Sequence, residues 1–114
     1  MALQDALSVG ELRLVFTSVG AGAEVGSPFS VPPKGSQESH RYISWEVRPA
    51  AGITAWTYSL QGSNDGIVFV VIQNIVSAVQ LGQVNTVGPI ACKYVRINQT
   101  SNAGVGVITG YILI

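Results

Sequence analysis

Charged residues are scarce in this sequence. Lys, Arg, Asp and Glu together make up 11% of the 114 residues, whereas a typical soluble domain carries about 25%. Six basic and six acidic residues give a formal net charge of zero. The basic residues form no cluster that could release counterions from a phosphate backbone. We therefore expect no nucleic-acid partner.

Long hydrophobic runs are absent as well. The longest stretch without a charge lies between Asp65 and Lys93, and polar residues such as Gln73 and Asn85 interrupt it throughout. A bilayer-spanning helix needs roughly 18 or more predominantly apolar residues. Residues 1–16 lack the basic segment and the following apolar run that are typical of a signal peptide. We expect no membrane segment and no signal peptide.

Residues that commonly carry out chemistry are few. Cys92 is the only cysteine, so no intrachain disulfide can form. It alternates with Tyr94 and Arg96 in a strand-like run, which indicates a small packing residue. His40 is the only histidine, and no serine stands in a recognisable nucleophile context. We predict no catalytic residue, no cofactor and no metal ion, and we interpret the protein as non-enzymatic.

Alternation of apolar and polar residues with a period of two dominates the rest of the sequence. This period predicts half-buried β-strands. It places apolar side chains on one face of four segments: Leu12, Leu14 and Phe16 in 11–19; Ile43, Trp45 and Val47 in 40–48; Trp56, Tyr58 and Leu60 in 53–61; and Val95 and Ile97 in 92–100. Residues 67–75 and 104–114 are more continuously apolar, which is typical of strands covered on both faces.

Clusters of turn-forming residues separate these segments at short intervals, and the only helix candidate lies in residues 2–8. Short strands punctuated in this way predict an all-β protein, with a single antiparallel β-sandwich or jelly-roll-like domain over residues 11–114. Residues 1–10 are too short for a core of their own, and we interpret them as an N-terminal arm that could reach a neighbour. The closing YILI, residues 111–114, could pair at a sheet edge in an oligomer.

The segment GSNDG, residues 62–66, lies between two predicted strands. Glycine tolerates a positive φ, and aspartate accepts hydrogen bonds from nearby backbone amides, so Asp65-Gly66 is a strong hairpin signal. We assign Asp65 and Gly66 to a structural turn. A cation site at Asn64 and Asp65 is the alternative, although a single carboxylate is few for calcium.

The aromatic residues admit two interpretations. Trp45, Trp56, Tyr42 and Tyr58 could stack on the sugar rings of a glycan. In a β-sandwich, however, one or two aromatic residues per strand more often pack in the core. We therefore favour core positions over a ligand platform.

Three segments carry a resemblance: ISWEV (43–47), WTYSLQGSNDGIVFVVI (56–72) and GPIACKYVRINQTSNAGVGVITGYILI (88–114). Their order resembles a pattern in small β-sandwich proteins of tailed-phage particles, and more loosely in discoidin-type carbohydrate-binding domains. In that pattern a strand ending in an L-x-G-S-x-D-G turn leads into a strand with a central aromatic, here Phe69. A Y-V-R-I strand and a Gly-containing hairpin precede the final apolar strand. We group Phe69 with Trp45 and Trp56 as core aromatics.

The resemblance covers roughly residues 40–114 and implies a bacteriophage virion protein. Roles in that family are capsid decoration, head or tail completion, and fibre or baseplate modules. We expect a capsid decoration (cement) subunit in the virion, whose partners are the major capsid protein or another virion protein and further copies of itself. The alternative is a carbohydrate- or receptor-binding module of a phage tail or fibre. Low charge favours decoration, because a lattice partner covers surface that a free monomer would have to solvate.

Overall fold

The computed structural model describes residues 5–7, 10–18, 22–31, 41–50, 53, 55–77, 82–90, 92–103 and 106–114. Within these ranges the chain forms ten β-strands and no helix. The strands are Asp5–Ala6 (β1), Arg13–Ser18 (β2), Glu24–Val25 (β3), Phe29–Ser30 (β4), Arg41–Pro49 (β5), Trp56–Ser63 (β6), Val70–Ser77 (β7), Gln83–Ile90 (β8), Tyr94–Asn102 (β9) and Ile108–Leu113 (β10).

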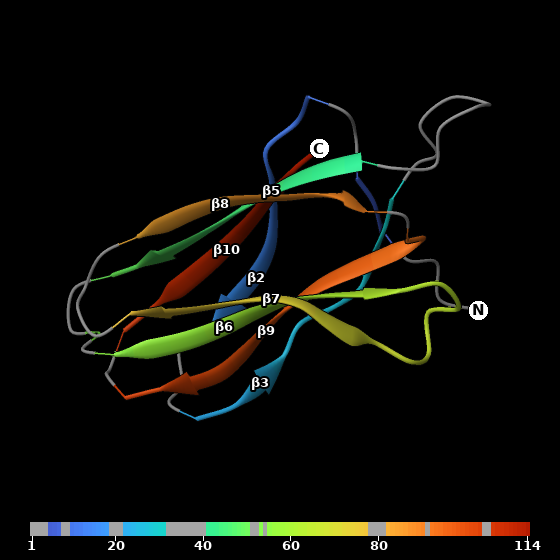
Figure 1. Cartoon of the computed structure of the whole chain (residues 1–114). Helices are drawn as coiled ribbons and strands as arrows, with labels where there is room; N and C mark the ends of the chain where they lie inside the picture. The colour runs from blue at the N-terminus through green and yellow to red at the C-terminus, as the bar shows by residue number, and fades with distance from the viewer. Residues whose placement is uncertain are drawn as a thin grey trace.

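The strands form two sheets that pack face to face (Figure 1). Sheet A has the order β1-β4-β9-β6-β7, with β3 also paired to β9, and sheet B has the order β2-β10-β5-β8. Apart from the parallel pair of β1 and β4, the pairs are antiparallel. The β-sandwich expected from the sequence is confirmed.

Residues 5–7 belong to the sandwich. β1 pairs with β4, the amide of Leu7 donates to the carbonyl of Ser30 at 2.9 Å, and the Leu7 side chain is buried in the core. The helix expected in residues 2–8 is therefore wrong for Asp5–Ala6, because so short a segment gains more from pairing with a strand than from an isolated helical turn. Residues 1–4, 8 and 9 lie outside the described ranges.

The core lies between the two sheets and comes from the inward positions of the alternating strands. As predicted, three such sets are buried: Ile43, Trp45 and Val47 on β5; Trp56, Tyr58 and Leu60 on β6; and Val95 and Ile97 on β9. The ring of Tyr58 meets those of Phe16 and Trp56 edge to face, with centroid separations of 5.3 and 5.7 Å. The aromatic rings thus join β2 of sheet B to β6 of sheet A.

The beginning of β2 departs from the predicted alternation. Phe16 is buried, but Leu12 and Leu14 are exposed and Val15 is buried instead. Gly110 pairs with Phe16 and Tyr111 pairs with Leu14, so Val15 is an extra residue in a β-bulge. A bulge moves the residues before it to the opposite face, and the predicted common face of Leu12, Leu14 and Phe16 is therefore wrong.

The two continuously apolar segments are not covered on both faces. Residues 67–75 lead into β7, which is an edge strand of sheet A, and Ile67 and Val68 are exposed. β10 is an inner strand of sheet B, yet its side chains alternate between buried and partly or fully exposed positions. Because the described strands form only two layers, the outer face of each sheet has no third layer over it. The expectation is wrong for both segments.

The C-terminal residues lie within sheet B. β10 is flanked by β2 on one side and β5 on the other, and the carbonyl of Ile114 accepts a hydrogen bond from the amide of Gly10 at 2.9 Å. Strands pair with β10 on both sides, so the prediction that residues 111–114 pair at a sheet edge in an oligomer is wrong.

Two buried tryptophans differ in their polar partners. Trp45 Nε1 donates to Gln73 Oε1 at 2.7 Å, and this hydrogen bond ties β5 of sheet B to β7 of sheet A. Trp56 Nε1 is buried and has no acceptor in the part of the chain that the structure describes. A buried polar group left unpaired costs about 1–3 kcal/mol, so the two indole N–H groups have opposite effects on stability.

We predict that Trp45→Phe lowers the free energy of unfolding by about 1 kcal/mol more than Trp56→Phe does. Both changes remove similar ring volume, but only Trp45→Phe leaves the Gln73 carbonyl oxygen without its donor. Chemical denaturation of the two variants measures the difference. Equal free energies of unfolding would contradict the role assigned to the hydrogen bond between the sheets.

Candidate functional site

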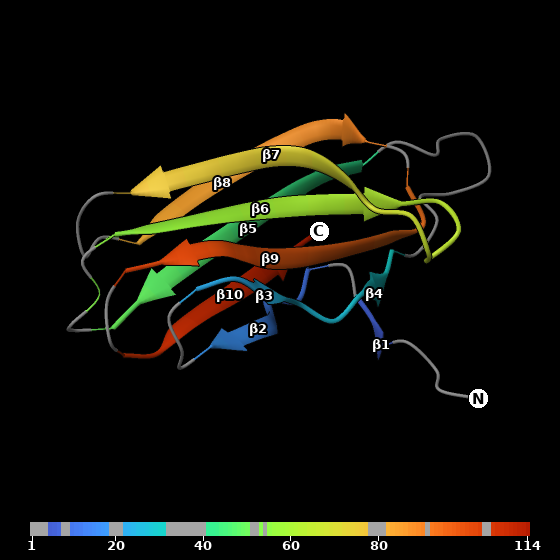
Figure 2. The same cartoon turned by 90° about the horizontal axis from the view of Figure 1, so that it is seen from below.

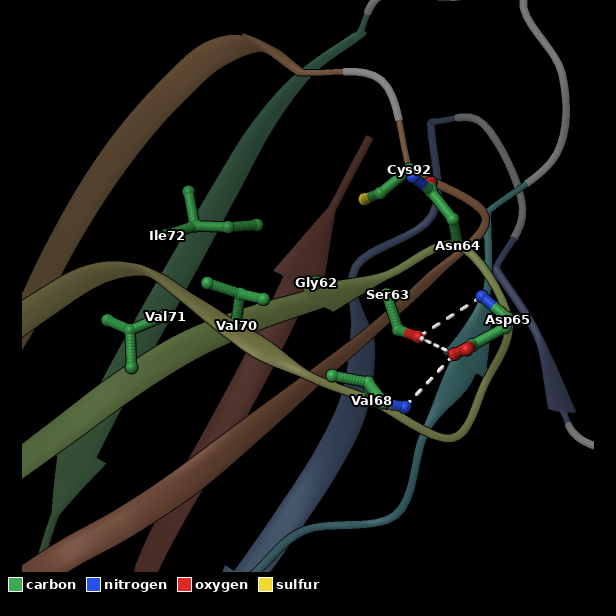
Figure 3. Close-up of a pocket in the computed structure, with 9 residues that line it drawn as sticks. All are labelled: Gly62, Ser63, Asn64, Asp65, Val68, Val70, Val71, Ile72 and Cys92. Carbon is green, nitrogen blue, oxygen red and sulfur yellow. Dashed lines mark hydrogen bonds between the residues drawn. The ribbon is translucent and has the colours of Figure 1, made fainter.

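The connection between β6 and β7 is closed by Ser63 and Asp65 (Figure 3). The Ser63 hydroxyl donates to Asp65 Oδ1 at 2.9 Å and accepts from the amide of Gly66 at 2.9 Å. Asp65 Oδ1 also accepts from the amides of Ile67 at 2.8 Å and Val68 at 3.0 Å. These two side chains thus hold the backbone amides of the turn.

The turn also determines the φ angle of Gly66 and lowers the pKa of Asp65. Gly66 has a φ of 77°, in the left-handed region that favours glycine. The pKa of Asp65 lies below its ordinary value of 3.8, because the amides of Ile67 and Val68 and then the Ser63 hydroxyl stabilise the carboxylate. Among the described residues, no group of three or more His, Cys, Asp or Glu side chains is placed to hold a metal ion. The geometry of Asp65 is that of a turn residue.

We predict that Gly66→Val lowers the free energy of unfolding by about 1 kcal/mol or more, because a β-branched residue rarely adopts a positive φ. Asn64→Val is the matched control, since Asn64 is exposed in the same turn and its φ is not positive. Thermal unfolding compares the two. Equal melting temperatures for both variants and the unmodified protein would contradict the turn assignment.

Acid should remove the contribution of the Asp65 carboxylate to the stability of the fold. A carboxyl group with a lowered pKa in the folded state stabilises the fold above its ordinary pKa of 3.8, and this contribution is lost as the pH falls through the folded-state value. The melting temperature of the unmodified protein should therefore exceed that of Asp65→Asn near neutral pH. The gap should narrow once the pH falls below 3.8. Melting curves recorded from neutral to strongly acidic pH test this, and a gap independent of pH would contradict it.

An apolar hollow of about 490 Å³ lies beside this turn (Figure 3). Val70, Val71 and Ile72 of β7 line it together with Cys92. Burial raises the pKa of the Cys92 thiol, which keeps it in the unreactive protonated form at neutral pH. Cys92 also packs against the core, as predicted from its position in the sequence. The hollow therefore offers apolar contact surface rather than a nucleophile.

Three of the four aromatic residues considered for sugar stacking are inaccessible. Trp45, Trp56 and Tyr58 are at most 1% exposed. The Tyr58 hydroxyl donates to Gln99 Oε1, and burial raises its pKa. Tyr42 differs from them, because it is 61% exposed. A sugar ring needs a free aromatic face, so a stacking platform built on the first three is wrong and their predicted core positions are confirmed.

Phe69 lies outside the core. It is half-buried in the β6–β7 connection, where the guanidinium carbon of Arg96 lies 4.0 Å from its ring centroid. Arg96 Nε in turn donates to Gln61 Oε1 at 2.9 Å. Phe69 comes just before the edge strand β7, so its ring packs on a guanidinium group rather than between the sheets. Its grouping with the core aromatics is wrong.

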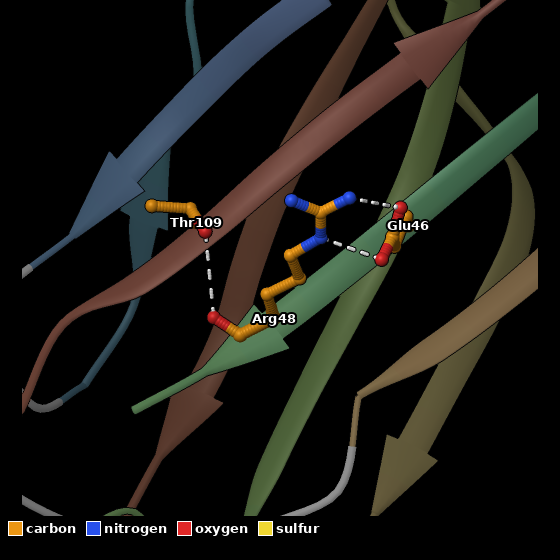
Figure 4. A network of polar contacts seen from close by, with 3 residues as sticks. All are labelled: Glu46, Arg48 and Thr109. Atoms are coloured by element: carbon orange, nitrogen blue, oxygen red, sulfur yellow. Dashed lines mark hydrogen bonds and ion pairs between the residues drawn. The ribbon is translucent and has the colours of Figure 1, made fainter. Parts of the chain in front are cut away.

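The outer face of sheet B carries an ion pair between Arg48 and Glu46 (Figure 4). Arg48 donates from Nε and Nη2 to the two carboxylate oxygens of Glu46, at 2.6 and 3.0 Å. Its guanidinium carbon lies 4.2 Å from the ring centroid of Tyr111, and its carbonyl accepts from the hydroxyl of Thr109 at 3.5 Å. Exposed apolar side chains of β2, β5 and β10 on this face are Leu14, Tyr42 and Leu113, and Val84 of β8 lies on it opposite Glu46. We call Leu14, Tyr42 and Leu113 the sheet B patch.

β7 and β8 lie along the same side of the sandwich (Figure 2). β7 is the last strand of sheet A, and β8 is the last strand of sheet B. Gln83 Nε2 donates to the carbonyl of Val76 at 3.4 Å, which joins the two edges. The exposed apolar side chains along them are Val70, Val71 and Val76 on β7 and Val84 on β8. We call these four the β7–β8 edge.

The sequence interpretation missed this edge, because it expected residues 67–75 to be covered. A signal for it was nevertheless present, since the uncharged stretch between Asp65 and Lys93 contains both strands.

No helix in the described ranges is long and apolar enough to cross a membrane. Comparison with protein-family models, curated proteins and solved structures finds no match to this chain. His40, the only histidine of the sequence, lies outside the described residues.

Proposed function

We propose that this chain is a non-enzymatic virion structural protein, a capsid decoration subunit that binds the capsid lattice and its own copies. The observation that carries the proposal is the exposed apolar side chains of the β7–β8 edge and of the sheet B patch. Val76, Val84 and Tyr42 are each 60% exposed or more. Large apolar side chains that lie close together on the surface of a folded domain favour a site that another molecule covers.

Resemblance to small β-sandwich proteins of tailed-phage particles supplies the class of partner. The β-sandwich agrees with that resemblance, and the L-x-G-S-x-D-G segment forms the turn between β6 and β7 that the pattern requires. In the described part of the chain, the hollow beside this turn combines apolar side chains with a protonated thiol. These features support assembly on a protein surface rather than catalysis.

The sheet B patch is the surface that we expect to meet the capsid. It lies on the broad face of sheet B, whereas β7 is the last strand of sheet A, so contact between copies through β7 leaves Leu14 and Leu113 open to the capsid. An N-terminal arm would add a second contact. Leu7 is buried in its own domain, so the deletion that tests the arm stops at residue 4 and keeps Leu7.

We predict saturable co-sedimentation of the purified protein with tailed-phage capsids that lack it. Leu14→Lys should weaken this binding, because it places a charge in the sheet B patch, where an apolar contact is expected. Val25→Lys is the control, since Val25 is also exposed but lies on β3 of sheet A. A variant that lacks residues 1–4 should also bind capsids less tightly than the unmodified protein, because the N-terminal arm is expected to contact the lattice.

A different outcome would favour the carbohydrate- or receptor-binding alternative. Tyr42 is the exposed member of the four aromatics considered for that role. A folded protein that binds no capsid but retains a specific glycan, with binding lost in Tyr42→Ala, would overturn the decoration proposal. Glycan-array binding of the unmodified protein and Tyr42→Ala distinguishes the two.

A further inference from the structure

β7 lacks most of the features that protect an edge strand from pairing with another chain. Natural edge strands carry charged residues, especially lysine, or contain proline, whereas Val70–Ser77 contains neither. A bulge at Ile72 is the protective feature present, since Leu60 pairs with Gln73 and Gln61 pairs with Val71. Beyond the bulge, residues 73–77 keep a regular register with β6, and no described strand pairs with their other side. The Val76 carbonyl accepts from Gln83 Nε2 at 3.4 Å, and a pairing strand would replace this single side-chain contact.

The charge distribution along the chain points to the same surface. All six basic and six acidic residues lie outside residues 66–92, the stretch that contains both β7 and β8. The neutral β7–β8 edge offers no charge for an oppositely charged partner to recognise. It also offers no repulsion to an identical edge, so a second copy of the same chain is its natural complement.

The size of this side suits a dimer. A strand of eight residues is about 27 Å long, and packed sheets lie about 10 Å apart. With side chains included, the side formed by β7 and β8 covers roughly 500 Å² on each copy, so a dimer would bury roughly 1,000 Å² in total. This lies at the lower limit of about 1,000 Å² for a biological interface and below the roughly 1,200 Å² of stable ones, so we expect a weak dimer.

We infer that β7 pairs with β7 of a second copy of this chain, antiparallel about a two-fold axis, so that sheet A continues from one copy into the other. Val71 and Val76 then lie along the new strand pair. The inference deepens the proposed function, which includes contact between copies, but it is tested on the purified chain without capsids. A protein that dimerises but does not bind capsids would contradict only the proposed function. A protein that binds capsids but stays monomeric would contradict only this inference.

The test is sedimentation velocity of the full chain over a range of concentrations. The unmodified protein should shift from monomer to dimer as its concentration rises. The double variant Val71→Lys/Val76→Lys should raise the dimer dissociation constant roughly tenfold or more, because it places four like charges on one strand pair. The control Leu14→Lys/Val25→Lys matches it in exposure, at 47% and 66% against 47% and 67%, and should leave the dimer unchanged.

Hydrogen exchange of the unmodified protein gives a second measurement that does not depend on how the variants fold. Backbone amides of residues 73–77 should exchange more slowly at high concentration than at low concentration. A protein that stays monomeric at every concentration would overturn the inference. Exchange rates of the amides of residues 73–77 that do not change with protein concentration would overturn it as well. Dimers weakened as much by Leu14→Lys/Val25→Lys as by Val71→Lys/Val76→Lys would also overturn it.

Discussion

The Trp45 indole joins the two sheets of this protein. Its ring is buried at the centre of the inward face of β5, and its N–H reaches Gln73 on β7, the edge strand of the opposite sheet. One side chain thus contributes apolar burial to the core and a hydrogen bond that fixes an edge. β7 pairs with β6, and the hydrogen bonds from Trp45 to Gln73 and from Gln83 to Val76 tie it to sheet B. These two hydrogen bonds help to determine how the β7 edge is presented to a partner.

Two local irregularities place apolar side chains on the surface. The bulge at Val15 turns Leu14 outward into the sheet B patch, and the bulge at Ile72 breaks the register of β7 with β6. Without the first bulge, strict alternation would keep Leu14 on the buried face together with Phe16. The proposed capsid contact therefore depends on a change of register as much as on the choice of residue.

The candidate site could be predicted from the sequence only in part. Asp65 and Gly66 were recognisable because turn chemistry is local: a carboxylate accepts amides two and three residues ahead, and glycine supplies the positive φ. Phe69 and the valines of β7 were misplaced. Apolar side chains in an exposed edge strand and in a covered central strand follow the same sequence pattern, and the position of a strand in its sheet depends on partners far away in the chain.

The sequence by itself determined the all-β class, the inward faces of β5, β6 and β9, and the local turn between β6 and β7. Each of these follows from a period of two or from residues within a few positions of one another. Only the tertiary structure decided the strand order, the bulges and the two exposed apolar surfaces. The physical reason is that exposure depends on which strands pair and which face lacks a covering layer, and these long-range contacts cannot be read from local periodicity.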